Sequence, residues 1–462
     1  MHAPPGPPSA DPTPALADAF SSAGKALYLV GGSVRDLLLG RPSPDLDFTT
    51  DARPRQVKTL LRRAGADSIF AVGEKFGTIG AWFGDCLVEV TTYRSERYQP
   101  GSRKPDVEFG HSLYGDLSRR DFTVNAIAQD VRSGELVDPF GGQADLKARL
   151  IRAVGCAAER FAEDPLRLLR AVRLAVQLGL DIEPATRQAI VEEADRLAEI
   201  SRERIAQEMH KLLLAGPPTR GIRLLCDLGL MRQIIPELLA MRGMLEDRYR
   251  HKDVFEHTLQ VVDRSPPVLA VRWAALLHDI AKPRTRSVEN GQVHFFGHER
   301  VGEQMAARIL AGLHLDRRTI ERVCTLVRMH QRANSYDEDW TDGAVRRFMR
   351  EAGPALEDLL VLSRADVTTR RPEKMRAAAR RVTALETRVA EIRAREDVER
   401  LSSPLDGHEL MALFGRGPGP WIKPIKDRLL SAVLDGTLAP DDKEGAAAVA
   451  RETLADLEGQ AT

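Results

Sequence analysis

Residues 27–50, LYLVGGSVRDLLLGRPSPDLDFTT, decide how the first part of this 462-residue chain folds. The apolar run Leu27–Val30 predicts a short strand, and a glycine pair leads from it into a helical stretch at residues 34–39. A second strand is predicted at residues 45–48. Working outward, a third strand is predicted at residues 87–91, so we expect a mixed α/β unit that extends to about residue 150.

Two aspartates, Asp45 and Asp47, lie two residues apart in the second predicted strand. Strand alternation places both carboxylates on one face, where they can hold hard cations such as Mg²⁺. Metals held in this way can activate an attacking hydroxyl and stabilise the leaving oxygen in phosphoryl transfer. Taken alone, an Asp-x-Asp pair is more often a turn or a solvated face. Glu89 lies opposite Val88 and Val90 on the third strand and is equally well a third carboxylate at the metals or a solvent-facing residue.

Gly31, Gly32 and Ser33 stand between the first strand and its helix. Glycines there let backbone N–H groups approach a phosphate, and the start of a helix attracts negative charge. Arg35 follows in the first turn and could pair with a triphosphate. Glycine pairs before helices are usually only tight turns, so the ordered set of residues carries the prediction.

Four segments, in this order, resemble the class II tRNA nucleotidyltransferase and bacterial poly(A) polymerase family of the polymerase-β-like superfamily. They are LYLVGGSVRDLLLGRPSPDLDFTT, VEVTTYR, RRDFTVNAIA and EDPLRLLRAVRLA. The resemblance covers residues 27 to about 238. It implies that Asp45 and Asp47 bind two Mg²⁺ ions, and that an RNA 3′-OH attacks the α-phosphate of a nucleotide while pyrophosphate leaves.

The third segment contains Arg120, Asp121 and Asn125. We expect Arg120 to contact phosphate or ribose, Asp121 to cap a helix that begins near Phe122, and Asn125 to contact the sugar.

The fourth segment is the one that would select a base. Asp164 and Arg167 stand on either side of Pro165, at a spacing that places both on one helix face. A carboxylate and a guanidinium can match the hydrogen-bonding edge of a base, and in the resembled family this pair reads CTP or ATP. Arg170 and Arg173 extend the basic stripe towards RNA or triphosphate. The alternative is an ordinary surface helix with a Glu163–Arg167 ion pair worth about 0.3–0.5 kcal/mol.

A second set of residues, in the order H…HD…H…H…D, resembles the HD phosphohydrolase superfamily, with the phrases LLHDIAKPRTR and FFGHERVG supporting the match. Its members are His257, His278, Asp279, His298, His330 and Asp366. Imidazole and carboxylate ligands suit a transition metal. The resemblance implies metal-dependent phosphohydrolysis, of 2′,3′-cyclic phosphates or phosphate-blocked RNA ends. The alternative is a retained domain that only shapes the RNA-binding body.

Helical periodicity dominates from about residue 151, where strand signals disappear, so the predicted fold class is α+β. We expect a polymerase-β-like head followed by a mostly helical neck, an HD domain and a tail. The predicted boundaries are 1–22 for a disordered N-terminal tail, 23–150 for the head, 151–250 for the neck with the base-selecting segment, 251–370 for the HD metal domain and 371–462 for a helical RNA-binding region.

Composition narrows the class of protein further. The net charge is zero, so RNA affinity has to come from local basic surface. No apolar run reaches the ~20 residues that span a bilayer, and the four cysteines form no CxxC pair, so we expect a cytoplasmic protein. The predicted activity is CCA addition to tRNA from CTP and ATP. The alternatives are a poly(A) polymerase, a partial (CC or A) adder, a phosphohydrolase with an RNA-binding first half, and a non-catalytic RNA scaffold.

Overall fold

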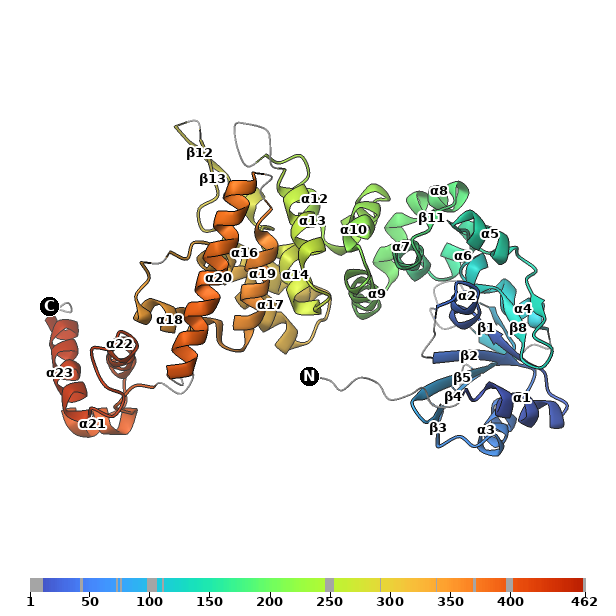
Figure 1. The fold of residues 1–462 in the computed structure, drawn as a ribbon, viewed down its shortest axis with the longest axis horizontal. Coiled ribbons are helices and arrows are strands. Elements are labelled where there is room, and N and C mark those ends of the chain that lie inside the picture. Colours follow the sequence, from blue (N-terminus) through green and yellow to red (C-terminus); the bar gives the residue numbers. More distant parts are fainter. Residues whose placement is uncertain are drawn as a thin grey trace. The chain divides into compact units, whose positions relative to one another are not determined.

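The computed structural model divides into two compact units, residues 1–236 and 237–462. It describes residues 11–41, 45–71, 74, 77–97, 106–109, 112–245, 253–290, 292–337, 339–368, 371–395 and 402–459. Figure 1 labels the helices and strands of both units.

The first unit contains a seven-stranded sheet with the order β3-β4-β5-β2-β1-β8-β9. All three strands predicted from the sequence belong to this sheet. The strands are β1 (Leu27–Val30), β2 (Asp45–Thr50), β3 (Ser68–Phe70), β4 (Thr78–Phe83), β5 (Cys86–Thr92), β8 (Ala128–Asp130) and β9 (Leu136–Val137). Only the β2–β5 pair is parallel, and the other neighbours are antiparallel. A separate hairpin joins β6 (Arg94–Arg97) to β7 (Asp106–Phe109).

Helices cover both faces of this sheet. Figure 1 shows α2 (Gly32–Leu38) above the strands, with α1 (Thr13–Ser22) and α3 (Pro54–Arg63) below them. The prediction of a disordered tail over residues 1–22 is therefore wrong for residues 13–22, while residues 1–10 lie outside the described residues. Leu16 and Phe20 on α1 are fully buried, and prolines are tolerated in a first helical turn, so a proline-rich start does not prevent this helix.

The rest of the first unit is mostly helical, as predicted. Its helices are α4 (Leu113–Ser118), α5 (Gly142–Ala148), α6 (Ala157–Glu163), α7 (Leu166–Leu178), α8 (Pro184–Glu192), α9 (Arg202–Leu214), α10 (Pro218–Asp227) and α11 (Met231–Ile234). A single 3₁₀ turn lies at Thr123–Asn125, and a six-residue 3₁₀ helix lies at Ala194–Glu199. Strand structure does not vanish at residue 151, since β10 (Leu150–Ile151) pairs with β11 (Asp181–Ile182). These pairs are too short to give a period of two in the sequence. Helix α7 is buried on nearly every face and forms the centre of this region.

The second unit contains a helical bundle around the predicted HD residues. Its helices are α13 (Val254–Arg264), α14 (Leu269–Leu277), α15 (Lys282–Thr285), α16 (His298–Gly312), α17 (Arg317–Asn334), α18 (Asp342–Ala352), α19 (Leu356–Asp366) and α20 (Pro372–Arg395), preceded by α12 (Pro236–Leu239). Trp273 on α14 is fully buried within the bundle. A small hairpin, β12 (Ser287–Glu289) with β13 (Gln292–His294), lies between α15 and α16.

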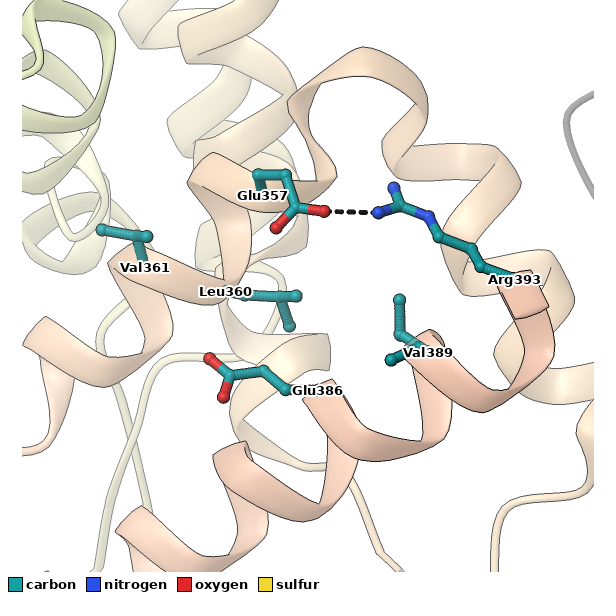
Figure 2. Close-up of a pocket in the computed structure, with 7 residues that line it drawn as sticks. Glu357, Leu360, Val361, Glu386, Val389 and Arg393 are labelled. Atoms are coloured by element: carbon teal, nitrogen blue, oxygen red, sulfur yellow. Dashed lines mark hydrogen bonds and ion pairs between the residues drawn. The ribbon is translucent and has the colours of Figure 1, made fainter. Parts of the chain in front are cut away.

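A groove separates α19 from α20, with Leu360 and Val389 on its walls (Figure 2). Glu357 and Arg393 face each other across it at 2.5 Å. Three further helices, α21 (Gly407–Phe414), α22 (Ile422–Leu434) and α23 (Lys443–Gly459), enclose their own apolar cluster. They contact α18, where Arg346 donates to the carbonyl of Leu434 at 2.9 Å. Within the described part of the chain, no helix is both long and apolar enough to cross a bilayer.

Candidate functional site

Three carboxylates occupy one face of two neighbouring strands. β2 and β5 run parallel, and their register sets Asp47 directly beside Glu89. Asp45 lies two residues before Asp47 on the same face, whereas Val88 and Val90 point to the other face and are fully buried. The parallel placement expected for Glu89 is therefore present, and the β2–β5 register gathers Asp45, Asp47 and Glu89 on one face of the sheet.

The electrostatics of these carboxylates suit a cation. Burial raises the pKa of Asp47, the nearby Arg120 lowers it, and the charge of Asp45 raises it further. Burial also raises the pKa of Glu89, followed by the charges of Asp47 and Asp45. Carboxylates that repel one another in this way gain stability when a cation lies between them, and oxygen ligands are those that Mg²⁺ prefers. The donor set therefore fits the metal that the sequence predicts.

Gly31 lets Arg120 approach the carboxylates. Its φ of +69° is one that side chains rarely adopt, and a Cβ there would lie 2.8 Å from Nη1 of Arg120 and 4.0 Å from Oδ2 of Asp47. Arg120 donates to the carbonyl of Asn125 at 3.3 Å and contacts Asp116 at 3.4 Å. Its Nε is buried with no hydrogen-bond partner. A buried, unsatisfied donor beside the carboxylate face supports the predicted phosphate or ribose contact.

We expect Gly31→Ala to lower the rate of the predicted nucleotidyl transfer at least tenfold. The new methyl group displaces Arg120, and the alanine at this positive φ strains the backbone by about 1–3 kcal/mol. Gly134→Ala is the matched control, since Gly134 has a φ of +75° but no atom within 4 Å of its Cβ position. Gly134→Ala therefore strains the backbone without bringing the new methyl group against another side chain. Equal losses of transfer in the two variants, measured by extension of a truncated tRNA, would show that Gly31 has no role beyond its backbone.

Ser33 acts on the strand, in a role that the sequence did not reveal. Its hydroxyl donates to the carbonyl of Asp45 at 3.2 Å and accepts from the N–H of Asp47 at 3.0 Å. The side chain is buried. These two bonds tie the start of α2 to the aspartate strand, so the hydroxyl positions the backbone that carries the carboxylates.

A continuous hydrogen-bonded network joins the head to the neck. Arg35 holds Asp36 through two bonds of 2.8 and 2.9 Å and donates to Oδ1 of Asn125 at 2.7 Å. Asn125 donates in turn to Asp121 at 3.1 Å. Asp121 receives two further bonds, of 2.8 and 2.6 Å, from Arg170 on α7. These residues therefore fix α2, the 3₁₀ turn and α7 relative to one another.

Asp121 accepts hydrogen bonds from Asn125 and Arg170 in addition to one at the predicted helix start. The helix expected near Phe122 is a single 3₁₀ turn, Thr123–Asn125, and Asp121 accepts from the N–H of Phe122 at 2.9 Å. Burial raises the pKa of Asp121, but the charge of Arg170 and the bond from Asn125 outweigh it and lower the pKa to about 2. The carboxylate therefore stays ionised within the network.

We expect Asp121→Asn to lower the free energy of unfolding by roughly 2 kcal/mol at pH 7, from the shift of the pKa from 3.8 to about 2. Because the folded-state pKa is lowered, this stability is present above the unfolded-state pKa and is lost as the pH falls from about 4 to about 2. Urea unfolding at pH 7, 4 and 3 should show the two proteins converging as the pH falls. A constant difference would contradict the role given to the charge.

The segment around Arg167, which is predicted to select the base, is fixed to the head by hydrogen bonds. Arg167, which is buried, donates to the carbonyl of Arg119 at 2.8 Å, to that of Arg160 at 3.0 Å, and to Glu163 at 2.6 Å. The Glu163–Arg167 ion pair of an ordinary surface helix, the alternative to base selection, is thus present. These contacts use three of the five guanidinium donors, so pairing with Glu163 and contact with a base are compatible.

Asp164 lies just before α7 and is more accessible. It accepts from the N–H of Leu166 at 3.1 Å and from Arg204 on α9 at 2.7 Å. A carboxylate retains acceptor capacity after two such bonds. Arg204 is not among the residues singled out from the sequence, because its partner stands 40 positions away and no local spacing connects them.

Arg170 and Arg173 do not form one stripe. Arg170 faces Asp121, whereas Arg173 is buried and bonded to Glu208 at 2.5 Å and to Gln177 at 2.6 Å. The contacts of Arg173 indicate a structural role between α7 and α9. Asp116, whose fully buried side chain binds Arg119 and Arg120, is a further residue of the head that is not predicted from the sequence. The i, i+3 and i, i+4 spacing of these three residues is the signal that could have found it.

The six HD residues come together in the second unit. Within the described residues, two groups of three have ligand atoms lying within 4.8 Å of one another: His257 with His278 and Asp366, and Asp279 with His298 and His330. Asp279 connects the two groups, because Oδ2 lies 3.2 Å from Nε2 of His278 and Oδ1 lies 3.4 Å from Nε2 of His298. Each group offers three ligand atoms to a cation, and Asp279 lies within reach of both groups.

The hydrogen bonds of the rings fit metal ligation. His278, His298 and His330 each place Nδ1 2.7–2.8 Å from a backbone carbonyl, which fixes Nδ1 as the donor. Their Nε2 atoms are then directed inwards. Nε2 of His298 lies 3.3 Å from Nε2 of His330, and Nε2 of His257 lies at the same distance from Nε2 of His278. Ring nitrogens that face each other in this way are what a bound cation brings together.

The pKa values of the buried groups in the cluster also favour a bound cation. Burial lowers the pKa of His278, but Asp279 and Asp366 outweigh it and raise the pKa to about 9. Burial and the neighbouring His278 lower the pKa of His330 to about 4. Both carboxylates have lowered pKa values despite their burial. The cluster therefore stabilises positive charge at its centre, which a divalent cation supplies.

Family models match three successive parts of the chain. A Poly A polymerase head domain model matches residues 27–152, a model of the probable RNA and SrmB-binding site of polymerase A matches residues 179–241, and an HD domain model matches residues 252–371. Nucleotidyltransferase heads and HD domains generally use metal ions. The three matches follow the predicted order of head, neck and HD domain.

Relatives match over nearly the whole length. The A-adding tRNA nucleotidyltransferase of Deinococcus radiodurans is 36% identical, over 87% of this chain and 90% of the relative. The CCA-adding enzyme of Anoxybacillus flavithermus is 33% identical, over 89% of each. The chain belongs to the tRNA nucleotidyltransferase family. Among solved structures of this family, the Bacillus stearothermophilus CCA-adding enzyme in complex with CTP matches with a TM-score of 0.66 and 29% identity, over 96% of this chain and 97% of that one.

Proposed function

We propose that this nucleotidyltransferase adds CCA to tRNA 3′ ends from CTP and ATP without a template. The observation that carries the proposal is the attachment of the base-selecting segment to the catalytic head. Arg167 is bonded to the carbonyl of Arg119, and the next two residues, Arg120 and Asp121, reach the carboxylate face and α7. One nucleotide can then meet the metal face through its phosphates and the neck through its base.

Each group has a role in this arrangement. Asp45 and Asp47, with Glu89 beside them, would hold Mg²⁺, which supplies activation of the 3′-OH and stabilisation of the leaving pyrophosphate. The N–H groups at Gly31 and Gly32 and the guanidinium of Arg120 bind the phosphates. Asn125 fixes Arg35 and Asp121. Asp164 and Arg167 offer an acceptor and donors to the edge of cytosine or adenine, and Arg170 holds the α7 helix that carries them in place.

The second candidate is a partial adder, which the D. radiodurans A-adding relative favours. The test is incubation of the full-length chain with Mg²⁺, CTP and ATP on tRNA transcripts that end before CCA, after C and after CC. Extension of all three to the same CCA end is the expected result. Extension of the CC-ending transcript alone would establish an A adder, and a long A tail would establish a poly(A) polymerase.

We also propose that the HD cluster hydrolyses phosphate esters at RNA ends, with a transition metal at His257, His278, Asp279, His298, His330 and Asp366. The chemistry of the donor set supports a transition metal, because four imidazoles and two carboxylates converge on two positions that share Asp279. Lys282, whose Nζ lies 2.8 Å from Asp279, can neutralise a bound phosphate. Release of phosphate or opening of a cyclic phosphate by the protein loaded with Ni²⁺, Co²⁺ or Mn²⁺ tests this activity.

Nucleotide addition and phosphohydrolysis both act on RNA, and we propose that the protein is located in the cytoplasm, where tRNA matures. Its four cysteines, all within the described residues, form no disulfide, which suits a reducing compartment. The exposed basic residues of α20, such as Arg376 and Arg380, belong to the region that we propose contacts the tRNA backbone.

A further inference from the structure

A pair of stacked rings lies beside the HD cluster. His294, at the end of β13, and Phe296 have ring planes 8° apart and centroids 4.9 Å apart. The Phe296 side chain is 67% exposed, the highest fraction among the large hydrophobic side chains of the described residues. An aromatic face held parallel to a neighbour and open to solvent can extend its stack to another flat group.

The segment that carries these rings is anchored to the cluster. Phe296 precedes His298 by two residues, so their Cα atoms are at most about 7 Å apart. Phe295, which stands between His294 and Phe296, accepts through its carbonyl from Nδ1 of His298 at 2.8 Å. Nζ of Lys282 lies 5.4 Å from the centroid of the Phe295 ring and 2.8 Å from Oδ2 of Asp279. A flat group on Phe296 and a phosphate at the cluster can therefore belong to one small ligand.

The charge of the surrounding segment suits a phosphate ester. Residues 282–300 contain four basic side chains and two acidic ones. Arg284, Arg286 and Arg300 are exposed. A positively charged rim around an acidic, metal-directed centre attracts phosphate groups from solution and from the adjoining backbone of a nucleic acid.

We propose that His294 and Phe296 form a stacking platform for the terminal base of an RNA whose 3′-phosphate enters the HD cluster. The proposal rests on the phosphohydrolase function proposed above and narrows its substrate to phosphate esters that carry a base. Because every base has a π face, the platform selects a nucleotide without selecting a sequence. This property suits an activity on RNA ends of differing sequence.

The test uses a three-nucleotide RNA that ends in 2-aminopurine with a 3′-phosphate. Its fluorescence falls when the 2-aminopurine base stacks, and the phosphate blocks extension at the transferase site. The full-length protein is treated with a chelator, so that binding is read without hydrolysis. We expect saturable quenching by the wild type, and Phe296→Leu should abolish the quenching and weaken binding at least about fivefold.

Val288→Ala is the matched control, because Val288 is 56% exposed, has no ring, and lies on β12, which pairs with the strand β13 that ends at His294. It should quench as the wild type does. Quenching that persists in Phe296→Leu, or that falls equally in both variants, would overturn the platform.

Hydrolysis of the same RNA by the metal-loaded protein separates the two proposals. Phe296-dependent quenching without hydrolysis would retain the platform as a binding site and reject the phosphohydrolase function. Hydrolysis with the same KM in the wild type and in Phe296→Leu would retain that function and overturn the platform.

Discussion

Asp47→Ala and Asp45→Ala should each lower nucleotide addition at least about 10³-fold, equivalent to about 4 kcal/mol of transition-state stabilisation. Either change removes one ligand of the metals that the carboxylate face would hold, and no other residue in the β2–β5 register can replace it. The measurement is the rate of incorporation of labelled CTP into a truncated tRNA at saturating substrate.

The folded state should survive these changes. The pKa of Asp47 is raised, mainly by burial, so its ionised form is disfavoured by folding and its removal should leave the free energy of unfolding unchanged or higher. Asp85→Ala, which removes an exposed carboxylate at the turn between β4 and β5, should transfer as the wild type does. Transfer that survives loss of Asp45 or Asp47 in a folded protein would contradict the assignment of the catalytic face.

Asp279→Asn should remove bound transition metal and abolish phosphohydrolysis while leaving transfer unchanged. Asp279 contacts both groups of histidines, so loss of its charge affects both cation positions at once. The asparagine keeps the shape of the side chain but supplies a neutral ligand. Metal content by elemental analysis after dialysis, together with the rate of phosphate release, gives two independent readings.

The control for this experiment is Asp316→Asn, a change at an exposed N-cap of α17 in the same domain. It should leave both stability and metal content close to those of the wild type, because asparagine caps a helix about as well as aspartate does. Full metal binding by Asp279→Asn would reject the shared-carboxylate arrangement. Loss of transfer along with hydrolysis, in a folded protein, would show that the two activities depend on one another.

The sequence predicted the parts of the head that depend on local order. The strand, glycine turn, helix and aspartate pair of residues 27–50 are in the structure as predicted, because the apolar run and the Gly31 backbone determine them locally. From the sequence, a position of Glu89 beside Asp47 and a position facing solvent are equally well predicted. A strand of alternating residues does not show which neighbour it will pair with.

Contacts between distant elements were not predictable. Arg173 carries the same charge as Arg170 one turn away, yet one is buried against Glu208 and the other holds Asp121. Helix α1 was missed because its prolines suggest disorder, while the burial of Leu16 and Phe20 depends on the packing of α3. The six HD residues were found because their types and order, not their distances along the chain, identify a ligand set.

The most direct test of the account is to incubate the full-length chain and Mg²⁺ with a tRNA that lacks all three terminal nucleotides, supply all four nucleoside triphosphates, and sequence the 3′ ends. Because Asp164 and Arg167 are proposed to select the base without a template, every extended product should end in CCA, with neither G nor U incorporated. Products that stop at CC, that gain only A, or that contain all four bases would contradict it.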